Sequence, residues 1–211
     1  MNIGVIFAGG VGSRMHSKDR PKQFLDIYNK PIIVHTIEHF QNSEDIDSIV
    51  VVCIEGWIDY MNQLVYQYRL NKVKKIVPGG KTGQLSIYNG LIAAQEIARD
   101  EENIVLIHDG VRPLINEELI KRNIQDVKDY GSSITSGIVK ETIVEIYDNN
   151  DIKLVPDRAH SRVAKAPQCF WLKDILSAHK KAMNEQSFNF YVFIWSICHM
   201  EFISIIFHHT T

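Results

Sequence analysis

Short apolar runs alternate with segments of helical periodicity along most of the chain. Asn2–Ala8, Ser48–Ile54 and Asn103–His108 are nearly continuous apolar runs, as expected of parallel strands that are buried on both faces. In the segments between and after them, apolar residues recur every three or four positions. This spacing predicts helices over residues 31–40, 57–68, 86–99 and 116–130, the last one ended by Gly131.

The alternation predicts an α/β fold, namely a doubly wound, mostly parallel sheet with helices on both faces. A further short strand, Lys75–Val77, is closed by Pro78-Gly79-Gly80. Ligands of such sheets bind beyond the carboxyl ends of the strands. The loops after the first and third apolar runs and the Gly79-Gly80 loop therefore contain the candidate site.

Residues 138–156 depart from this pattern. Ile138–Tyr147 alternates loosely between apolar and polar positions, Asn149-Asn150-Asp151 is a turn signal, and Ile152–Val155 can pair back. The pattern predicts a β-hairpin that either projects from the sheet or lies at its edge. From these residues alone the edge hairpin is favoured.

Composition excludes several classes of protein. A chain of 211 residues with 45% hydrophobic and 23% charged residues is a globular domain, neither disordered nor fibrous. A net charge of −2 argues against a protein that mainly grips nucleic acid. Cys53, Cys169 and Cys198 lack metal-site spacing, and no signal-peptide pattern follows Met1, so we expect a cytoplasmic protein.

The last 24 residues differ in composition from the rest, so we divide the chain into a domain, 1–187, and an atypical tail, 188–211. The tail holds seven of the chain's 20 aromatic residues but one charged residue, Glu201. A frameshifted or truncated reading frame is the first interpretation, and a packed element that replaces a regular one is the second. A membrane anchor ranks third, because residues 188–207 are long enough to cross a bilayer but include His199 and Glu201. We therefore expect no membrane association.

Glycines follow the first predicted strand directly, in Ala8-Gly9-Gly10-Val11-Gly12-Ser13-Arg14-Met15. Such a loop brings backbone N–H groups close to phosphate. A dinucleotide fingerprint would need a third glycine where Met15 stands, and the Lys-Ser/Thr of a P-loop is absent. A nucleotidyltransferase loop fits better, because Arg14 and Lys22 supply two cations. Fixed cations suit a reaction in which negative charge builds on an α-phosphate.

Further motifs follow in order along residues 2–187. They are Pro21-Lys22-Gln23-Phe24-Leu25, Gly79-Gly80, Ser86-Ile87-x-Asn89-Gly90-Leu91, His108-Asp109-x-x-Arg112-Pro113, Lys140-Glu141-Thr142-Ile143, Asp157-Arg158 and Pro167-Gln168-x-Phe170. With the glycine loop, they resemble those of the CTP-dependent cytidylyltransferases that act on 2-C-methyl-D-erythritol 4-phosphate and of their relatives that act on ribitol 5-phosphate. The resemblance implies a Rossmann-like nucleotidyltransferase fold, with CTP and a polyol phosphate as substrates.

The resemblance assigns the glycine loop to the nucleotide. Ala8, Gly9 and Gly10 match backbone contacts to CTP, and Arg14 and Lys22 match the cations that stabilise the five-coordinate α-phosphate. The phosphate monoester of the polyol then attacks in line, and pyrophosphate leaves. Because the second pKa of such a monoester is about 6, no catalytic base is needed. His108 is therefore expected to be a structural histidine.

The other nucleotide contacts implied by the resemblance come from two later loops. Gly80 and Ser86 match positions that hold the cytosine ring. Asp109 matches a residue that binds the CTP ribose or helps to hold Mg²⁺ through its carboxylate oxygens. The expected cofactor is therefore Mg²⁺, with Asp109 as its ligand.

The polyol phosphate is implied to lie between two subunits. Arg112 and Thr142 match contacts to this substrate, and Arg158 matches the residue that positions its phosphate for attack. In the family the hairpin at 138–156 is an arm exchanged between subunits. The resemblance therefore favours a projecting arm and a homodimer over the edge hairpin.

Two details favour ribitol 5-phosphate as the acceptor over 2-C-methyl-D-erythritol 4-phosphate. They are the loop Ala8-Gly9-Gly10, in place of Ala-Ala-Gly, and the segment Pro156–His160. The family's late lysine, which helps to position the substrate phosphate, has no counterpart in the tail. An alternative of another class is therefore a weakly active, truncated nucleotide-binding remnant, and a nicotinamide oxidoreductase ranks third.

Overall fold

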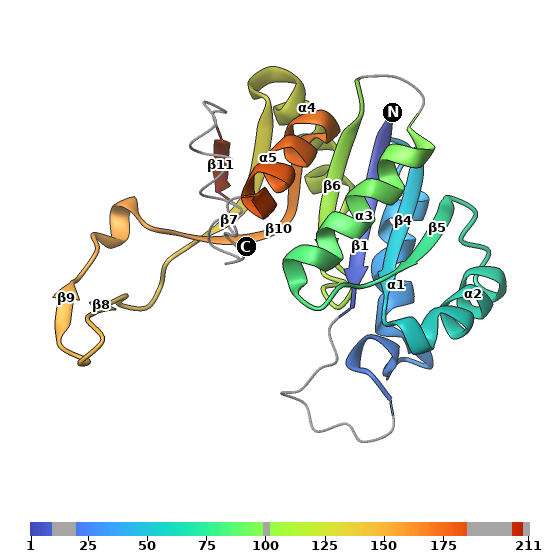
Figure 1. Ribbon diagram of the computed structural model, residues 1–211, viewed down its shortest axis with the longest axis horizontal. Helices are drawn as coiled ribbons and strands as arrows, with labels where there is room; N and C mark the ends of the chain where they lie inside the picture. The colour runs from blue at the N-terminus through green and yellow to red at the C-terminus, as the bar shows by residue number, and fades with distance from the viewer. Residues whose placement is uncertain (10–19, 99–101, 185–203, 209–211) are drawn as a thin grey trace.

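The computed structural model describes residues 1–9, 20–98, 102–184 and 204–208, the last five as backbone. Within these residues, seven strands form one sheet in the order β11-β7-β10-β6-β1-β4-β5 (Figure 1). They are β1 (Asn2–Ala8), β4 (Ser48–Cys53), β5 (Val73–Pro78), β6 (Ile104–Asp109), β7 (Ser132–Ile138), β10 (Arg162–Trp171) and β11 (Ser204–His208). Strands β5, β4, β1 and β6 are parallel, whereas β10 is antiparallel to β6 and β7. The predicted mostly parallel α/β fold is confirmed.

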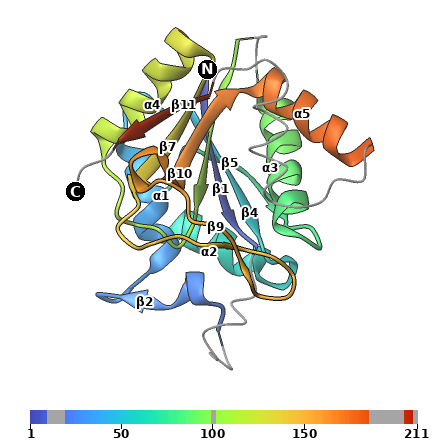
Figure 2. The same ribbon diagram turned by 90° about the vertical axis from the view of Figure 1, so that its left-hand side faces the viewer.

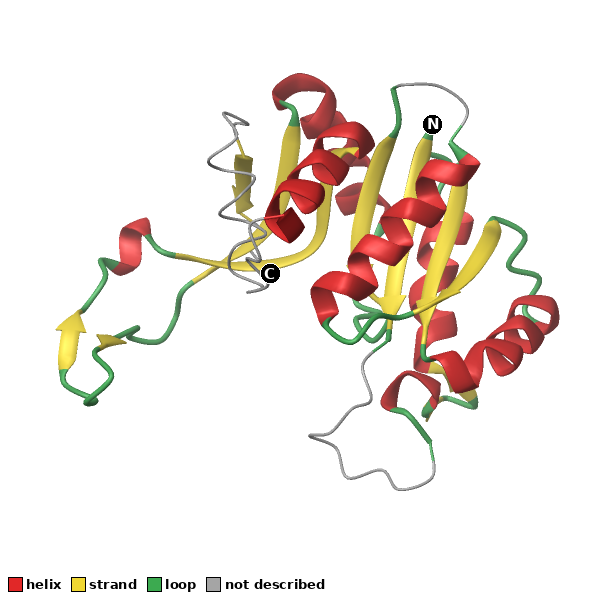
Figure 3. Ribbon diagram, in the orientation of Figure 1, coloured by secondary structure: helices red, strands yellow, loops and turns green. Residues whose placement is uncertain are grey.

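Helices cover both faces of this sheet (Figure 3). The α-helices of the described residues are α1 (Ile32–Asn42), α2 (Ile58–Gln67), α3 (Gly83–Ile97), α4 (Glu117–Tyr130) and α5 (Leu172–Asn184). Buried side chains of α1, α2 and α4 share one core cluster, and those of α3 and α5 share another. The shorter elements are η1 (Lys22–Phe24), β2 (Asp26–Ile27), β3 (Lys30–Pro31), η2 (Glu55–Trp57), β8 (Glu145–Ile146), β9 (Ile152–Leu154) and η3 (Arg158–His160). No helix among the described residues is long and apolar enough to span a membrane.

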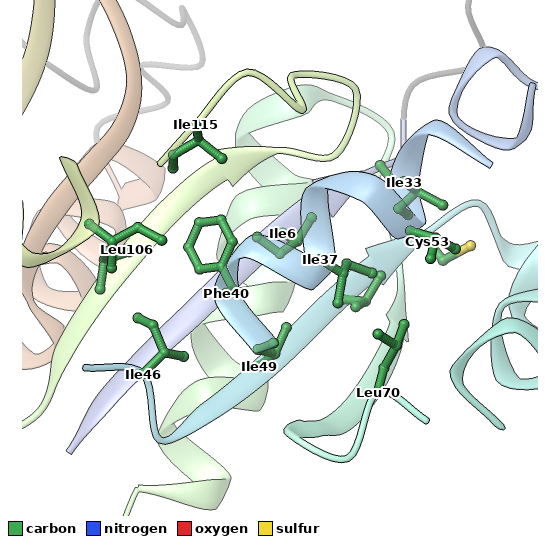
Figure 4. Close-up of a cluster of buried hydrophobic side chains, with 14 of the residues drawn as sticks. Ile6, Ile33, Ile37, Phe40, Ile46, Ile49, Cys53, Leu70, Leu106 and Ile115 are labelled. Atoms are coloured by element: carbon green, nitrogen blue, oxygen red, sulfur yellow. The ribbon is translucent and has the colours of Figure 1, made fainter. Parts of the chain in front are cut away.

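The continuous apolar runs follow from burial on both faces. In β4, Ile49 and Val51 belong to the cluster on the α1 side, while Val50 and Val52 belong to the cluster on the α3 side. Figure 4 shows the first cluster, in which the ring of Phe40 lies among isoleucine side chains of the sheet and of α1. A strand between two helical layers needs apolar residues at every position, so it shows no alternation.

The ends of α1, α2, α3 and α4 agree with the predicted boundaries to within three residues, whereas α5 was not predicted. Helix α3 begins at Gly83 rather than at Ser86, because the Thr82 hydroxyl accepts a hydrogen bond from the Leu85 N–H at 3.2 Å. The Asn116 side chain caps α4 in the same way, at 2.9 Å from the Leu119 nitrogen. Gly131 ends α4 with a φ of 92°, a conformation that glycine adopts readily.

The hairpin does not lie at the edge of the main sheet, so the edge interpretation is wrong. Strands β8 and β9 form a separate two-stranded ladder. They are shorter than predicted, with two and three residues. Figure 1 shows this arm, residues 138–156, projecting away from the sheet beyond the ends of β7 and β10, and in Figure 2, viewed from that side, the arm lies in front of the sheet.

We expect Gly90→Ala to destabilise the fold, because α3 packs closely on the sheet at this glycine. A Cβ atom at Gly90 would lie 2.7 Å from a methyl carbon of Val5 and 2.7 Å from one of Val52. Overpacking of this kind costs about 1–3 kcal/mol. The control is Gly83→Ala in the same helix, where a Cβ would meet nothing within 4 Å. Urea unfolding measures both, and equal midpoints would contradict the prediction.

Stability is expected to fall as pH drops below 6.5, because α5 buries His179. Burial lowers the pKa of His179 from 6.5 to about 4. The unfolded chain therefore binds a proton that the folded chain does not, and stability is lost between pH 6.5 and about 4, by up to about 1.4 kcal/mol per pH unit. Urea unfolding at pH 7.5 and 5.5 measures the loss. His179→Gln is expected to reduce it, and an unchanged pH dependence would contradict this assignment.

Candidate active site

The chain reverses its direction of winding between β1 and β6. From β1 it moves outward to β4 and β5, and then crosses back to β6 on the other side of β1. The carboxyl ends of β1 and β6 meet there, since Phe7 pairs with Asp109. The Gly110 N–H donates to the Phe7 carbonyl at 3.0 Å, which holds the two loops together. Such a switch point is where α/β sheets bind their ligands.

The Gly79-Gly80 loop lies against the start of the glycine loop. A Cβ atom built on Gly9 would lie 3.5 Å from the Gly79 Cα and 3.3 Å from the Ser86 hydroxyl oxygen. That hydroxyl accepts from the Gly80 N–H at 3.0 Å and donates to the Thr82 carbonyl at 2.9 Å. Ser86 is buried and closes the loop from Gly80 onward. The structure thus brings together three predicted nucleotide residues, Gly9, Gly80 and Ser86.

Lys22 lies on η1, which is attached to the end of β1. The side chain of its neighbour Gln23 is buried, and its Nε2 donates to the Ala8 carbonyl at 2.5 Å. Phe24, also buried, joins the core cluster of α1 and α2. Lys22 itself is only half-buried, whereas the next two residues of η1, Gln23 and Phe24, are fixed in the interior.

Asp109 and Arg112 form a small polar unit at the end of β6. The Arg112 Nε donates to the Asp109 carboxylate in an ion pair. His108 donates from Nε2 to the Arg112 carbonyl at 3.0 Å, and Thr36 donates to the Gly110 carbonyl at 3.1 Å. Burial lowers the pKa of His108, although the bond to Arg112 opposes this shift. A buried, neutral His108 agrees with its predicted structural role.

Of the remaining predicted substrate residues, Thr142 lies on the arm and Arg158 lies just beyond it, in η3. Thr142 is exposed, and the Arg158 Nη1 donates to the Lys140 carbonyl at 3.2 Å, so η3 is tied to the base of the arm. Asp157 caps η3 through the Ala159 N–H at 2.9 Å, and this bond and a second one to His160 lower the pKa of Asp157. Figure 1 shows the arm pointing away from the carboxyl ends of β1 and β6. The structure therefore groups Arg158 with the arm and not with Ala8.

Comparison with known families identifies the chain. The sequence model of IspD, 2-C-methyl-D-erythritol 4-phosphate cytidylyltransferase, matches residues 3–190. The chain belongs to the IspD family. This match confirms the predicted family resemblance and the expected enzyme class, a CTP-dependent nucleotidyltransferase.

Individual relatives within this family differ in their named substrate. A ribitol-5-phosphate cytidylyltransferase of Streptococcus agalactiae serotype V is 59% identical over 185 residues, which is 88% of this chain and 77% of the relative. A protein of the same name from Vibrio parahaemolyticus is 52% identical over the same shares. A 2-C-methyl-D-erythritol 4-phosphate cytidylyltransferase of Clostridium botulinum is 41% identical over 85% of this chain and 76% of that protein.

A solved structure supports the fold. The 4-diphosphocytidyl-2C-methyl-D-erythritol synthase of Anaerococcus prevotii superposes with a TM-score of 0.83, covering 99% of this chain and 89% of that one, at 23% identity. At this identity the likeness concerns the fold alone. It agrees with the nucleotidyltransferase-like sheet described above.

The residues of this IspD family member fit one bound Mg²⁺ when nucleotide is present. Asp109 offers a carboxylate at the switch point, with its side chain 25% exposed. No three His, Cys, Asp or Glu side chains of the described residues come together as a metal cage. Mg²⁺ commonly uses one or two carboxylates and takes its other ligands from water and substrate phosphates. One aspartate at the edge of the predicted phosphate site matches that pattern.

Some predicted residues lie outside the part of the chain that the structure describes. Gly10 and Arg14 are among them, as are residues 188–203 and 209–211 of the tail. Within the tail, β11 runs beside β7, with Ser204 opposite Ser132.

Sequence reasoning missed two residues that build the site. Gln23 and Thr36 hold Ala8 and Gly110 through buried hydrogen bonds. Gln23 is part of the Pro21–Leu25 motif, so its position could have been suspected. Thr36 lies in an ordinary helical pattern, and nothing in the sequence marks it.

The two described cysteines have no catalytic features. Cys53 and Cys169 are buried free thiols. Burial raises the pKa of Cys53 to about 11, and it raises the pKa of Cys169 as well. Both are therefore protonated core residues rather than nucleophiles.

Proposed function

We propose that this chain transfers the CMP group of CTP to ribitol 5-phosphate, forming CDP-ribitol and pyrophosphate. The observation that carries the choice of acceptor is the 59% identity over 185 residues to a ribitol-5-phosphate cytidylyltransferase. The 2-C-methyl-D-erythritol 4-phosphate enzyme of Clostridium botulinum reaches 41%. The two loop features that favour ribitol in the sequence point the same way.

The reaction needs cations and alignment rather than a base. The monoester phosphate of ribitol 5-phosphate is largely dianionic at neutral pH, because its second pKa is about 6. Its oxygen attacks the α-phosphorus of CTP, the bond to the bridging oxygen breaks, and pyrophosphate leaves. In this mechanism Lys22 and Arg14 stabilise charge on the α-phosphate, while Gly80 and Ser86 hold the base. Arg112, Thr142 and Arg158 hold the acceptor.

Mg²⁺ is proposed as the cofactor, held by Asp109 with the phosphates of CTP. When bound, it neutralises charge on the triphosphate. The Asp109 carboxylate is already placed by the neighbouring Arg112 guanidinium.

We further propose a homodimer in which each arm completes the partner's site. Apolar side chains of the arm are exposed in the isolated chain: Ile143, Val144, Ile146, Tyr147, Ile152, Leu154 and Val155. The ladder of β8 and β9 is too short to be stable alone. A second copy of the chain that covers these side chains would remove them from water and bring Thr142 and Arg158 to a site.

We also propose that the protein works in the cytoplasm, because its two described cysteines are free thiols, which suit a reducing compartment.

For the tail, we propose that residues from about 188 onward come from a shifted reading frame. The abrupt change in composition supports this proposal, and the matched family region ends at residue 190. Reading the coding DNA tests it. A shifted frame should restore a segment of the type Ile-Lys-x-Thr, and its absence in every frame would reject the proposal.

A paired assay tests the proposed reaction. The purified chain is given CTP and Mg²⁺ with either ribitol 5-phosphate or 2-C-methyl-D-erythritol 4-phosphate, and pyrophosphate release is followed. Faster release with ribitol 5-phosphate is expected. Faster release with the other acceptor would overturn the substrate choice. CTP binding without release from either acceptor would instead support a nucleotide-binding remnant.

A further inference from the structure

Lys22 is carried by a single turn, η1, that needs support from its surroundings. The turn has three residues, and one hydrogen-bonded turn is not stable by itself. A cation that stabilises a transition state must be held in place before the reaction, since misplacement by about 1 Å can cost about 100-fold in rate. Neighbouring residues must therefore fix η1.

An aromatic cluster anchors η1 through Phe24, its last residue. The ring of Phe24 stacks on Trp57, with centroids 5.0 Å apart and planes at 18°. It meets Tyr60 edge-on at 5.3 Å, and Trp57 meets Tyr60 edge-on at 5.6 Å. These three rings, which we call the aromatic pedestal, join η1 to η2 and α2. Such offset and edge-on pairs are the favoured geometries of aromatic rings.

Arg20, two residues before Lys22, contacts both the aromatic pedestal and the end of η1. Its guanidinium carbon lies 5.6 Å from the centroid of the Tyr60 ring, within the range of a cation–π contact. Its Nη1 donates to the Phe24 carbonyl at 3.4 Å, and the same nitrogen lies 3.9 Å from the Asp26 carboxylate. Arg20 therefore contacts residues on the carboxyl side of Lys22 and on α2, although it precedes Lys22 in the chain.

These contacts engage the guanidinium with the protein itself. A planar guanidinium can stack on a ring while donating from its edge, which an ammonium group cannot do. The Asp26 carboxylate also offsets part of its charge. Through Nη1 and the face of its guanidinium, Arg20 is thus suited to hold η1 onto α2.

We propose that Arg20 is a positioning residue that acts on the reaction through Lys22. It clamps η1 onto the Tyr60 face of the aromatic pedestal, while Gln23 ties the same turn to the Ala8 carbonyl. Lys22 is then held from two directions, by β1 and by α2. This inference rests on the proposed function, because it assigns Arg20 a role in the same cytidylyl transfer.

A double-mutant cycle tests the clamp. Arg20→Gln is made in the wild-type chain and in Lys22→Ala, and turnover is followed with labelled CTP and ribitol 5-phosphate. In the wild-type background kcat should fall by about tenfold, with the KM for CTP changed by less than about twofold. In the Lys22→Ala background the same substitution should change kcat by less than about twofold, because the group it positions is gone. Equal losses in both backgrounds, a raised KM alone, or no loss in either would overturn the proposal.

Two variants of Tyr60 distinguish the effect of its ring face, which Arg20 contacts, from the effect of its size in packing. Tyr60→Leu removes the ring and should reproduce the kcat loss of Arg20→Gln, whereas Tyr60→Phe keeps the ring face and should retain wild-type kcat. Arg69→Gln, two residues beyond the carboxyl end of α2, removes the same charge and should leave kcat unchanged. Thermal unfolding of each variant checks that the fold is kept. Wild-type kcat in Tyr60→Leu would overturn the proposal.

A readout without turnover distinguishes this inference from the proposed function. Lysines are methylated with a ¹³C label, and the Lys22 signal is assigned by its loss in Lys22→Ala. CTP should shift the Lys22 signal in the wild-type chain, and Arg20→Gln should reduce that shift while CTP binding measured by calorimetry is retained. An unreduced shift would overturn the role of Arg20 even in a chain that transfers CMP. Absence of turnover with both polyol phosphates would overturn the proposed function while the signal still tests the clamp.

Discussion

Lys22→Ala is expected to lower kcat by about 100- to 1,000-fold, the usual loss when one preorganised group that stabilises transition-state charge is removed. Lys22 lies on η1 next to Gln23, which is bonded to the last residue of β1. The turn that carries Lys22 is therefore fixed beside the end of β1, and the proposed reaction requires its ammonium group at the α-phosphate of CTP. Because charge builds on that phosphate in the transition state, the loss should appear mainly in kcat and much less in the KM for CTP.

The matched control for this substitution is Lys74→Ala. Lys74 lies on β5, and its ammonium group donates to the Asn71 carbonyl at 2.9 Å, near the amino end of that strand and away from the switch point. Steady-state rates of pyrophosphate release compare the two variants. Unchanged kcat in Lys22→Ala, with a raised KM for CTP, would assign Lys22 to ground-state binding instead.

Mixing two inactive variants is expected to restore activity. If the arm of one subunit serves the site of the other, a mixed dimer of Lys22→Ala and Arg158→Ala contains one site with both lesions and one site with neither. Random exchange makes half of the dimers mixed, so activity should recover to roughly a quarter of the wild-type level. Arg158 supports this expectation, because it is bonded to Lys140 at the base of the arm and not to the residues around Ala8.

The mixing experiment distinguishes an arm that completes the partner's site from an arm that completes the site of its own subunit. The two variants are co-unfolded and refolded together, and each is also refolded alone. Recovery in the mixture but not in either single sample supports the exchanged arm. No recovery, with dimers present by light scattering, would show that Arg158 serves its own subunit. A monomer of the wild-type chain would reject the homodimer itself.

The sequence pattern predicted those helices and strands that are determined by residues close together in the chain. The strands β1, β4 and β6 are buried on both faces, so they read as apolar runs, and Asn116 and Gly131 mark the ends of α4 through capping. The glycine loop and the Pro21–Leu25 motif were recognised because they are contiguous in the chain.

Two strands were missed because their sequences contradict the usual signals. Strand β7 has the sequence SSITSGI, and its hydroxyls are buried against α4, where Ser133 donates to the Asn123 side chain at 2.9 Å. Strand β10 contains Pro167 and shifts register between Ala164 and Gln168. Polar residues and proline both argue against a buried strand when only the order of residues is known. The strands form because their neighbours in space supply the hydrogen bonds and the room that these residues need.

The sequence by itself thus determined the α/β class, the family resemblance, and the residue types at the nucleotide edge. The tertiary structure decided which of these residues meet. It showed that the Ser86 hydroxyl closes the Gly80 loop, that Gln23 seals the end of β1, and that the arm leaves its own site. The physical reason is that hydrogen bonds and ring contacts depend on distance in space. Arg20 and Tyr60 are 40 positions apart in the chain, yet the guanidinium of Arg20 lies over the Tyr60 ring. No local pattern carries that information.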